Sequence, residues 1–307
     1  MSDNFADRLI RRTVELNSPV LAGLDPRPEL LSRELLLESG ETRPGLARAY
    51  VRFAEDVLDG LVDVAPAVKI QIAFYEALGP PGIEAYFSSV RLARERGFLV
   101  IGDIKRGDIG TSSAAYATAH FGAPAQELHA DVDAVTLSPY LGSDCLEPFL
   151  KICRSEGRGA FALVRTSNPS APEIQNLVAD GIPVYQHVAN LVQQWGEDLV
   201  GSEGYSSLGA VVGATYREEL LAIRKKNPSL LLLVPGYGAQ GGTAEDVGAC
   251  LDSRGTGLLV ASSRGILRAY REAADAGRSP VAGIREAAQQ MRDEIRAAWA
   301  DSRSKGD

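Results

Sequence analysis

Eight short apolar runs recur along the chain, and their spacing limits the folds that it can adopt. They cover residues 19–24, 67–72, 98–101, 134–137, 160–164, 208–212, 230–234 and 257–260. Each run has the length and the aliphatic or β-branched content typical of a buried strand. Amphipathic segments with helical spacing, such as 44–61 and 83–96, separate most of the runs. Strands that alternate with helices favour right-handed crossovers and a parallel sheet.

Eight such units predict a single (β/α)8 TIM barrel more than an open doubly wound sheet. The length of 307 residues suits one barrel, and no Pro- or Ser-rich linker divides the chain. We therefore expect one domain over residues 1–307, with an N-terminal helix at 1–17 and a frayed tail at 301–307. Residues 26–45, after the first strand, and 168–204, after the fifth, exceed a minimal unit. Both should carry extra helices or loops.

The overall charge bears on possible partners. A net charge of −8 argues against general affinity for nucleic acid or for an anionic membrane. The chain also has no run of 18 apolar residues that could cross a bilayer. A small anionic ligand stays compatible with this composition, because a local site can be positive on an acidic protein.

The cysteines and histidines give little sign of chemistry. The cysteines fit no disulfide framework and no metal-ligand spacing, which favours buried thiols and a cytoplasmic location. The histidines are scattered in helical segments away from the charged cluster described next, so we expect none to be catalytic. The residues concerned are Cys145, Cys153, Cys250, His120, His129 and His187.

The third apolar run leads into two carboxylates and a lysine, spaced Asp103-x-Lys105-x-x-Asp108. Strand alternation places Asp103 and Lys105 on one face, while Asp108 follows in a glycine-flanked loop. Opposite charges packed at a strand end cost desolvation unless they satisfy one another or a ligand. The segment is a candidate active site, although a surface ion pair would give the same pattern.

Lys69 stands inside the second apolar run. A lysine in such a strand is rarely buried without a partner, although it could also extend to the barrel rim. Asp25 follows the first strand, and Asp103 and Asp108 follow the third. These residues predict an alternating network of lysines and aspartates that titrates as a unit.

The last two strands end in a pattern that favours phosphate. Residues 235–242 include four glycines and Gln240, and Ser263-Arg264 opens a helix after the eighth strand. TIM barrels often bind phosphate at these two loops, through backbone N–H groups and the start of a short helix. The planar fork of an arginine suits phosphate oxygens.

Taken together, these motifs resemble the orotidine 5′-phosphate decarboxylase family, in its longer-chain, type 2 form. The resemblance covers roughly residues 19–267, with the motifs in the family's order. It implies a TIM barrel that converts orotidine 5′-phosphate to uridine 5′-phosphate, the last step of de novo pyrimidine nucleotide synthesis. It implies no cofactor and no metal ion, so that the protein itself stabilises a carbanion at C6 electrostatically.

The resemblance also implies catalytic roles for individual residues. Asp103 would lie beside the substrate carboxylate, Lys105 would protonate C6, and Lys69 would link the aspartates. Asp108 and Ile109 would reach into the site of a neighbouring subunit, so the protein would be a homodimer with shared active sites.

The substrate-binding residues follow from the same resemblance. Asp25 would contact ribose and Ser167 the pyrimidine ring, while Gln240 and Arg264 would hold the phosphate, with Ser263 beside them. A further ribose contact falls on Ser112, although Thr111 is equally placed.

Two other functions remain as alternatives. One is a Mg-dependent sugar-phosphate decarboxylase or synthase of the same superfamily, which places a carboxylate for Mg²⁺ on the second strand, where this chain has Lys69. A lysine there repels a divalent cation. The other is a non-catalytic barrel that binds a phosphorylated ligand.

Overall fold

The computed structural model describes residues 3–40, 42–122, 130–238 and 241–304. Eight parallel strands close into a barrel in the order β1-β10-β9-β8-β5-β4-β3-β2, which confirms the predicted TIM barrel. All eight expected runs form strands. Their bounds are β1 (Val20–Leu24), β2 (Ala67–Gln71), β3 (Leu99–Arg106), β4 (Ala134–Leu137), β5 (Gly159–Arg165), β8 (Ser206–Val212), β9 (Leu230–Pro235) and β10 (Leu258–Ser262).

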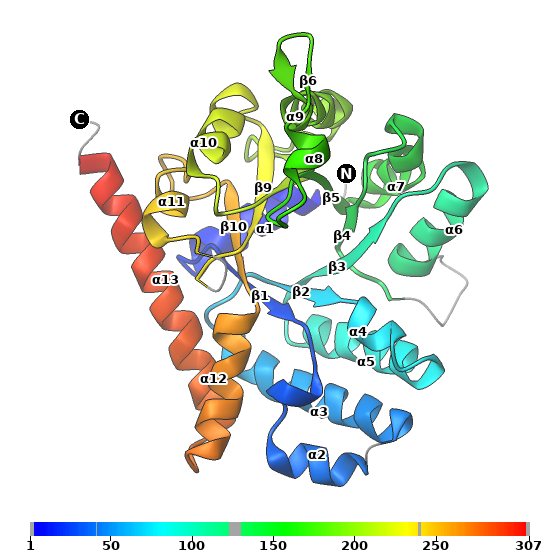
Figure 1. Ribbon diagram of the computed structural model, residues 1–307, viewed down its shortest axis with the longest axis vertical. Helices are drawn as coiled ribbons and strands as arrows, with labels where there is room; N and C mark the ends of the chain where they lie inside the picture. Colours follow the sequence, from blue (N-terminus) through cyan, green and yellow to red (C-terminus); the bar gives the residue numbers. More distant parts are fainter. Residues whose placement is uncertain (1–2, 41, 123–129, 239–240, 305–307) are drawn as a thin grey trace.

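Helices follow each barrel strand and surround the sheet (Figure 1). An outer core of aliphatic and aromatic side chains lies between the strands and these helices. The crossover helices are α3 (Arg43–Leu61), α5 (Pro80–Glu95), α6 (Gly110–Phe121), α7 (Ser143–Glu156), α9 (Val184–Trp195), α10 (Arg217–Lys226), α11 (Ala244–Gly248) and α12 (Arg264–Asp275).

Both expected insertions contain additional elements. After β1 come η1 (Pro28–Leu30) and α2 (Arg33–Ser39). After β5 come α8 (Pro172–Gln175) and an antiparallel hairpin of β6 (Val178–Ala179) and β7 (Ile182–Pro183), with η2 (Glu197–Leu199) beyond α9. Figure 1 shows α8 and β6 beside α9 at one end of the molecule. After β2, the short α4 (Ala73–Glu76) precedes α5.

The third strand extends five residues past its expected end at residue 101. Its charged continuation still pairs with both neighbours, because Gln71 lies opposite Asp103 on one side and Leu137 opposite Arg106 on the other. Pairing with β2 and β4 therefore extends the strand beyond its apolar residues, so that the charged residues of β3 form part of the barrel wall.

Helix α1 (Phe5–Glu15) closes the amino-terminal end of the barrel. Its apolar face joins the inner core formed by inward-pointing strand residues such as Leu21 and Phe161. The Phe5 and Phe161 rings meet edge to face, 6.0 Å apart. A Cβ atom on Gly159 would come within 2.3 Å of the Phe5 ring, so that close approach requires glycine. In the described part of the chain α1 therefore fills this end of the barrel, and the cavity opens at the carboxyl ends of the strands.

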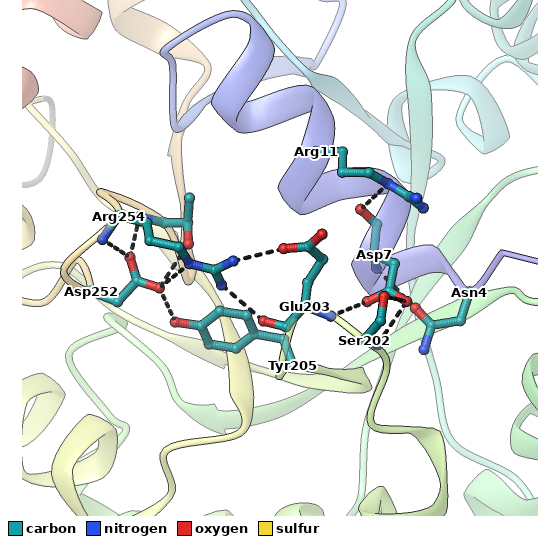
Figure 2. Close-up of polar contacts among 9 residues, drawn as sticks. Asn4, Asp7, Arg11, Ser202, Glu203, Tyr205, Asp252 and Arg254 are labelled. Atoms are coloured by element: carbon teal, nitrogen blue, oxygen red, sulfur yellow. Dashed lines mark hydrogen bonds and ion pairs between the residues drawn. The ribbon is translucent and has the colours of Figure 1, made fainter.

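Asp7 fastens α1 to the loop before β8, as Figure 2 shows. Its buried carboxylate accepts hydrogen bonds from the Ser202 and Glu203 backbone N–H groups, at 2.9 and 2.8 Å, and from the Ser202 hydroxyl. Burial raises the pKa of Asp7, but these hydrogen bonds outweigh it and hold the pKa below its ordinary value. Beside this contact, Asp252 accepts a hydrogen bond from the Tyr205 hydroxyl at 2.9 Å.

The last helix, α13 (Pro280–Ser304), corrects the expected fraying after residue 300. The Trp299 indole donates to the Asp252 carbonyl at 3.0 Å, and the Arg303 guanidinium donates to the Ser253 carbonyl. These contacts hold the helix against the barrel through Ser304; residues 305–307 lie outside the described part of the chain.

Two further expectations concern the chain as a whole. Cys145, Cys153 and Cys250 are all described, and all three are buried and free. Across the described ranges, no helix combines the length and the apolar character needed to span a bilayer.

We expect Asp7→Ala to lower the free energy of unfolding by about 2–3 kcal/mol, because it leaves two backbone N–H groups without acceptors. Urea denaturation would measure the loss. The Asp3→Ala control removes an exposed carboxylate paired with Arg11 and should cost about 0.5 kcal/mol or less. Equal losses in the two variants would contradict the role of Asp7.

Candidate active site

The barrel interior changes from apolar to charged as the strands run toward their carboxyl ends. Leu21, Ala67 and Ile101 belong to the inner apolar core. Because side chains alternate along a strand, the residues two and four places further along also point into the barrel. On β2 these are Lys69 and Gln71, and on β3 the first is Asp103. The predicted meeting of Lys69 with the aspartates follows from this register.

Asp103 is the centre of the charged group. It is 4% exposed, and both of its oxygens are fully engaged. Oδ2 accepts from Lys69 Nζ at 2.6 Å and from the Gln71 amide at 3.0 Å. Oδ1 accepts from the Lys105 ammonium and from the Thr136 hydroxyl, the latter at 2.8 Å. Four donors on one carboxylate fix its position and its charge.

The two buried charges of this group stabilise each other's ionised forms. Burial raises the pKa of Asp103, but Lys69 and Lys105 outweigh it and hold the pKa well below its ordinary value. Burial lowers the pKa of Lys69, but attraction to Asp103 and Asp25 raises it above the ordinary value. Both groups therefore stay charged throughout the physiological pH range.

Lys105 reaches Asp103 through an irregular backbone. Its φ of +46° lies in the left-handed region, and the register of β3 against β4 shifts between Gly102 and Arg106. The Lys105 N–H donates to the Thr136 hydroxyl at 3.1 Å, which holds this bulge in place. Strained residues and bulges of this kind concentrate at functional sites. Regular alternation predicts the contact between the two side chains but not this geometry.

Asp25 keeps an unused acceptor. Its Oδ1 atom lies 3.7 Å from Lys69 Nζ, and it is buried without a hydrogen-bond donor among the described residues. Ser263 packs against the nearby Gly23, where a Cβ atom would come within 1.9 Å of the Ser263 hydroxyl. Asp25 also lines the cavity, so this oxygen is available to a hydroxyl group of a ligand.

The side of the cavity formed by β9 and β10 carries the predicted phosphate residues. Ser263 is the N-cap of α12, and Arg264 is its first residue, as predicted. Both line the cavity with Tyr237, whose hydroxyl donates to Glu294 at 2.6 Å. A helix amino terminus beside an arginine suits an anion. Gln240 lies outside the described residues.

A cavity of about 870 Å³ joins these groups. Among its described lining residues are four cationic side chains and two anionic ones, which makes it a positive pocket on an acidic protein. Ser167 lines it as predicted, on the β5 side. Sequence reasoning missed several lining or supporting residues: Arg27, Gln71, Phe74, Thr136, Asn168, Gln175, Tyr185 and Tyr237.

The remaining predicted residues do not line the cavity of their own chain. Asp108 lies beyond the end of β3, where its carboxylate accepts from the Ile109 N–H at 2.8 Å. Ile109 is 53% exposed, and Thr111 and Ser112 are exposed in the first turn of α6. Within one chain, the structure thus brings together Asp25, Lys69, Asp103 and Lys105 but not Asp108.

A closed parallel barrel with ionisable side chains gathered at the carboxyl ends of its strands is the arrangement of (β/α)8-barrel enzymes. Residues 18–279 match the "Orotidine 5'-phosphate decarboxylase / HUMPS family". The chain belongs to this family.

Individual relatives agree with the family match. The chain is 43% identical over 269 residues to the orotidine 5'-phosphate decarboxylase of Rhodopirellula baltica, covering 87% of this chain and 89% of that protein. It is 41% identical over 295 residues to the enzyme of the same name from Clostridium perfringens strain SM101, covering 96% and 99%.

Solved structures share the fold. An OMP decarboxylase structure from Leishmania donovani superposes with a TM-score of 0.76 at 30% identity, over 97% of this chain and 99% of that one. The L. donovani UMP synthase structure gives a TM-score of 0.78 at 32% identity, covering 97% of this chain and 57% of that longer chain.

We expect Asp103→Asn to lower the free energy of unfolding by about 3 kcal/mol at pH 7, because it removes the anion between two ammonium groups, one of them fully buried. The native pKa of Asp103 is depressed, so its stabilisation is present above about pH 4, the ordinary value, and is lost as the pH falls. Urea denaturation of both proteins from pH 3 to 9 measures this dependence.

The difference between the two proteins should be constant from about pH 5 to 9 and should shrink below about pH 4. A difference that changed between pH 6 and 8 would contradict the assigned ionisation. In the native protein Lys69 adds no pH dependence over this range, because its pKa is raised and its stabilisation is lost only as the pH rises above the ordinary value of that pKa.

Proposed function

We propose that this protein decarboxylates orotidine 5′-phosphate to uridine 5′-phosphate, the last step of pyrimidine nucleotide synthesis, and that the Lys69–Asp103–Lys105 array performs the chemistry. The observation that carries the proposal is this buried array, open to a nucleotide-sized positive cavity in a chain of the decarboxylase family. A pocket of about 870 Å³ lies within the range of small-molecule sites.

The reaction needs a stabilised negative charge on carbon. When the bond between C6 and the carboxylate breaks, CO2 leaves and the electron pair remains on C6. An ammonium group held nearby stabilises that charge and then supplies the proton. Lys105 fits this role, because Asp103 and the bulge fix its position while its side chain keeps 45% exposure, through which solvent can restore the proton. Asp103, which pairs with Lys105, would face the departing carboxylate.

The remaining lining residues suit the rest of the nucleotide. Arg264, Ser263 and the start of α12 would bind the phosphate together with Gln240, and Asp25 would accept from ribose through its free oxygen. Ser167 would face the pyrimidine ring. Phosphate binding far from C6 can then supply energy that organises the charged groups.

We also propose a homodimer with shared sites. Asp108 and Ile109 do not line their own cavity, and they lie at the end of β3, where a second subunit could receive them. Large apolar side chains are exposed in the same region: Ile109 at 53%, Tyr140 at 81% and Leu141 at 50%. Burial of this surface against a second copy would bring Asp108, and with it Thr111 or Ser112, to the neighbouring site.

The cytoplasm is the proposed location. The three buried free thiols are typical of a reducing compartment.

The Mg-dependent rival has less support. Lys69 Nζ lies between Asp25 and Asp103, at 3.7 and 2.6 Å, where a cation-binding site would need both carboxylates free. The direct test follows the absorbance of orotidine 5′-phosphate in the presence and absence of EDTA. Turnover that is unaffected by EDTA supports the proposal. Turnover that EDTA abolishes would contradict a metal-free reaction, and binding without turnover supports a non-catalytic barrel.

We expect Lys105→Ala to lower kcat by at least about a thousandfold, because it removes both the cation and the proton donor. Circular dichroism should show an intact fold. Arg264→Ala serves as the comparison at the other end of the cavity: it should raise KM roughly fiftyfold and change kcat little, since a charge-assisted contact to phosphate is lost. Near-normal turnover of Lys105→Ala would refute the assignment.

Shared sites predict complementation between two inactive variants. In a mixture of Lys105→Ala and Asp108→Ala subunits, each mixed dimer contains one site with both native residues. Random mixing at equal amounts should restore about a quarter of the native activity. A mixture that stays as inactive as the separate variants would show that Lys105 and Asp108 do not act in one site.

A further inference from the structure

Arg165, at the carboxyl end of β5, is a buried charge that the proposed reaction does not use. It is 1% exposed and does not line the cavity. Its guanidinium donates to the Glu219 carboxylate twice, with Nε–Oε2 at 2.5 Å and Nη2–Oε1 at 3.3 Å. Such a two-pronged pair fixes orientation as well as charge. A buried arginine needs such a partner, and Glu219 on α10 supplies it.

Two aromatic rings hold the same guanidinium. Its central carbon lies 4.0 Å from the centre of the Tyr216 ring and 5.3 Å from that of the Tyr185 ring. Tyr216 precedes α10, and Tyr185 belongs to α9, beyond the hairpin insertion. Arg165 therefore joins the end of β5 to two helices that follow it.

A short chain of hydrogen bonds leads from Arg165 to the cavity. Arg165 Nη1 donates to Gln175 Oε1 at 3.3 Å, and that oxygen also accepts from the Thr166 N–H at 3.0 Å. The Gln175 amide donates to the Thr166 hydroxyl at 2.7 Å, which donates to Asn168 Oδ1 at 2.6 Å. Gln175 thus holds Thr166 at both backbone and side chain.

The segment held in this way is one wall of the cavity. Thr166, Ser167 and Asn168 all line it. In the barrel order β5 lies opposite β1, with β3 on one side and β9 on the other, two strands away in each direction. In the proposed function, a nucleotide with its phosphate at β9 and β10 and its reacting carbon at Lys105 would turn the remaining edge of its base toward β5. Hydroxyl and amide groups suit the polar edge of a pyrimidine.

We propose that Arg165 is a positioning residue that fixes the Thr166–Asn168 wall through Gln175, and so sets affinity for the base of the bound nucleotide. The inference rests on the proposed function for the identity of the ligand. Arg165 does not touch the ligand itself. Its effect depends on the rigid pair with Glu219, since a loosely held guanidinium would leave Gln175 free to turn away from Thr166.

The experiment compares inhibitors with and without a base. Ki values for uridine 5′-phosphate and ribose 5-phosphate are measured on the native enzyme and on Arg165→Lys, Glu219→Gln and Gln175→Leu. The matched control is Arg224→Lys. Arg224 also lies over a tyrosine ring, 5.5 Å from the centre of Tyr205, but it donates to the Leu230 and Gly257 carbonyls at the opposite end of the barrel.

We expect Arg165→Lys and Gln175→Leu to raise the Ki of uridine 5′-phosphate about tenfold and to change that of ribose 5-phosphate by less than about twofold. Glu219→Gln should show the same selectivity at about threefold. Arg224→Lys should change neither Ki, although its stability falls. If Arg165→Lys does not fold, the other two variants carry the test.

The proposal would be overturned if the Ki values of uridine 5′-phosphate and ribose 5-phosphate rose equally, or if neither rose. If Arg165 only supported the fold, its variants would not weaken binding of the base-containing inhibitor selectively. Failure of the proposed function is a separate result: the native enzyme would then leave orotidine 5′-phosphate unchanged.

Discussion

Asp103 is a carboxylate that the fold surrounds with four donors, two of them ammonium groups. An isolated charge at this depth would neutralise itself, and an isolated pair would gain little over an apolar core. The alternating order of charges resolves this, because every ion has a neighbour of opposite sign. The same order holds Lys105 at the cavity while part of its side chain stays in solvent. The alternation of charges therefore explains both why Asp103 and Lys69 can be buried and why Lys105 is held at the cavity.

Much of this arrangement can be predicted from sequence, because it depends on local periodicity. The eight apolar runs specify the strands, and the end of each strand specifies where polar residues gather. The same alternation could have identified Gln71, two residues after Lys69, and Thr136, two residues after the inward-pointing Ala134. Neither residue stands out in the sequence, because a neutral polar side chain costs less to bury than a charge and so does not by itself indicate a site.

Other features depend on distances that no local pattern contains. The left-handed backbone of Lys105 is stabilised by Thr136, 31 residues away, and Arg165 finds Glu219 at a separation of 54. Nothing in a window around either residue indicates its partner. Asp108 shows a further limit, since the single chain leaves it outside its own cavity and its predicted role needs a second subunit.

The helix that closes the amino-terminal end of the barrel has a consequence for biosynthesis. Asp7 binds Ser202 and Glu203, some 195 residues later, and Phe5 packs on Phe161. In a nascent chain leaving the ribosome, the apolar face of α1 therefore stays exposed to water until the sixth barrel strand, β8, has emerged. Contacts so distant along the chain slow folding and leave apolar surface open to aggregation.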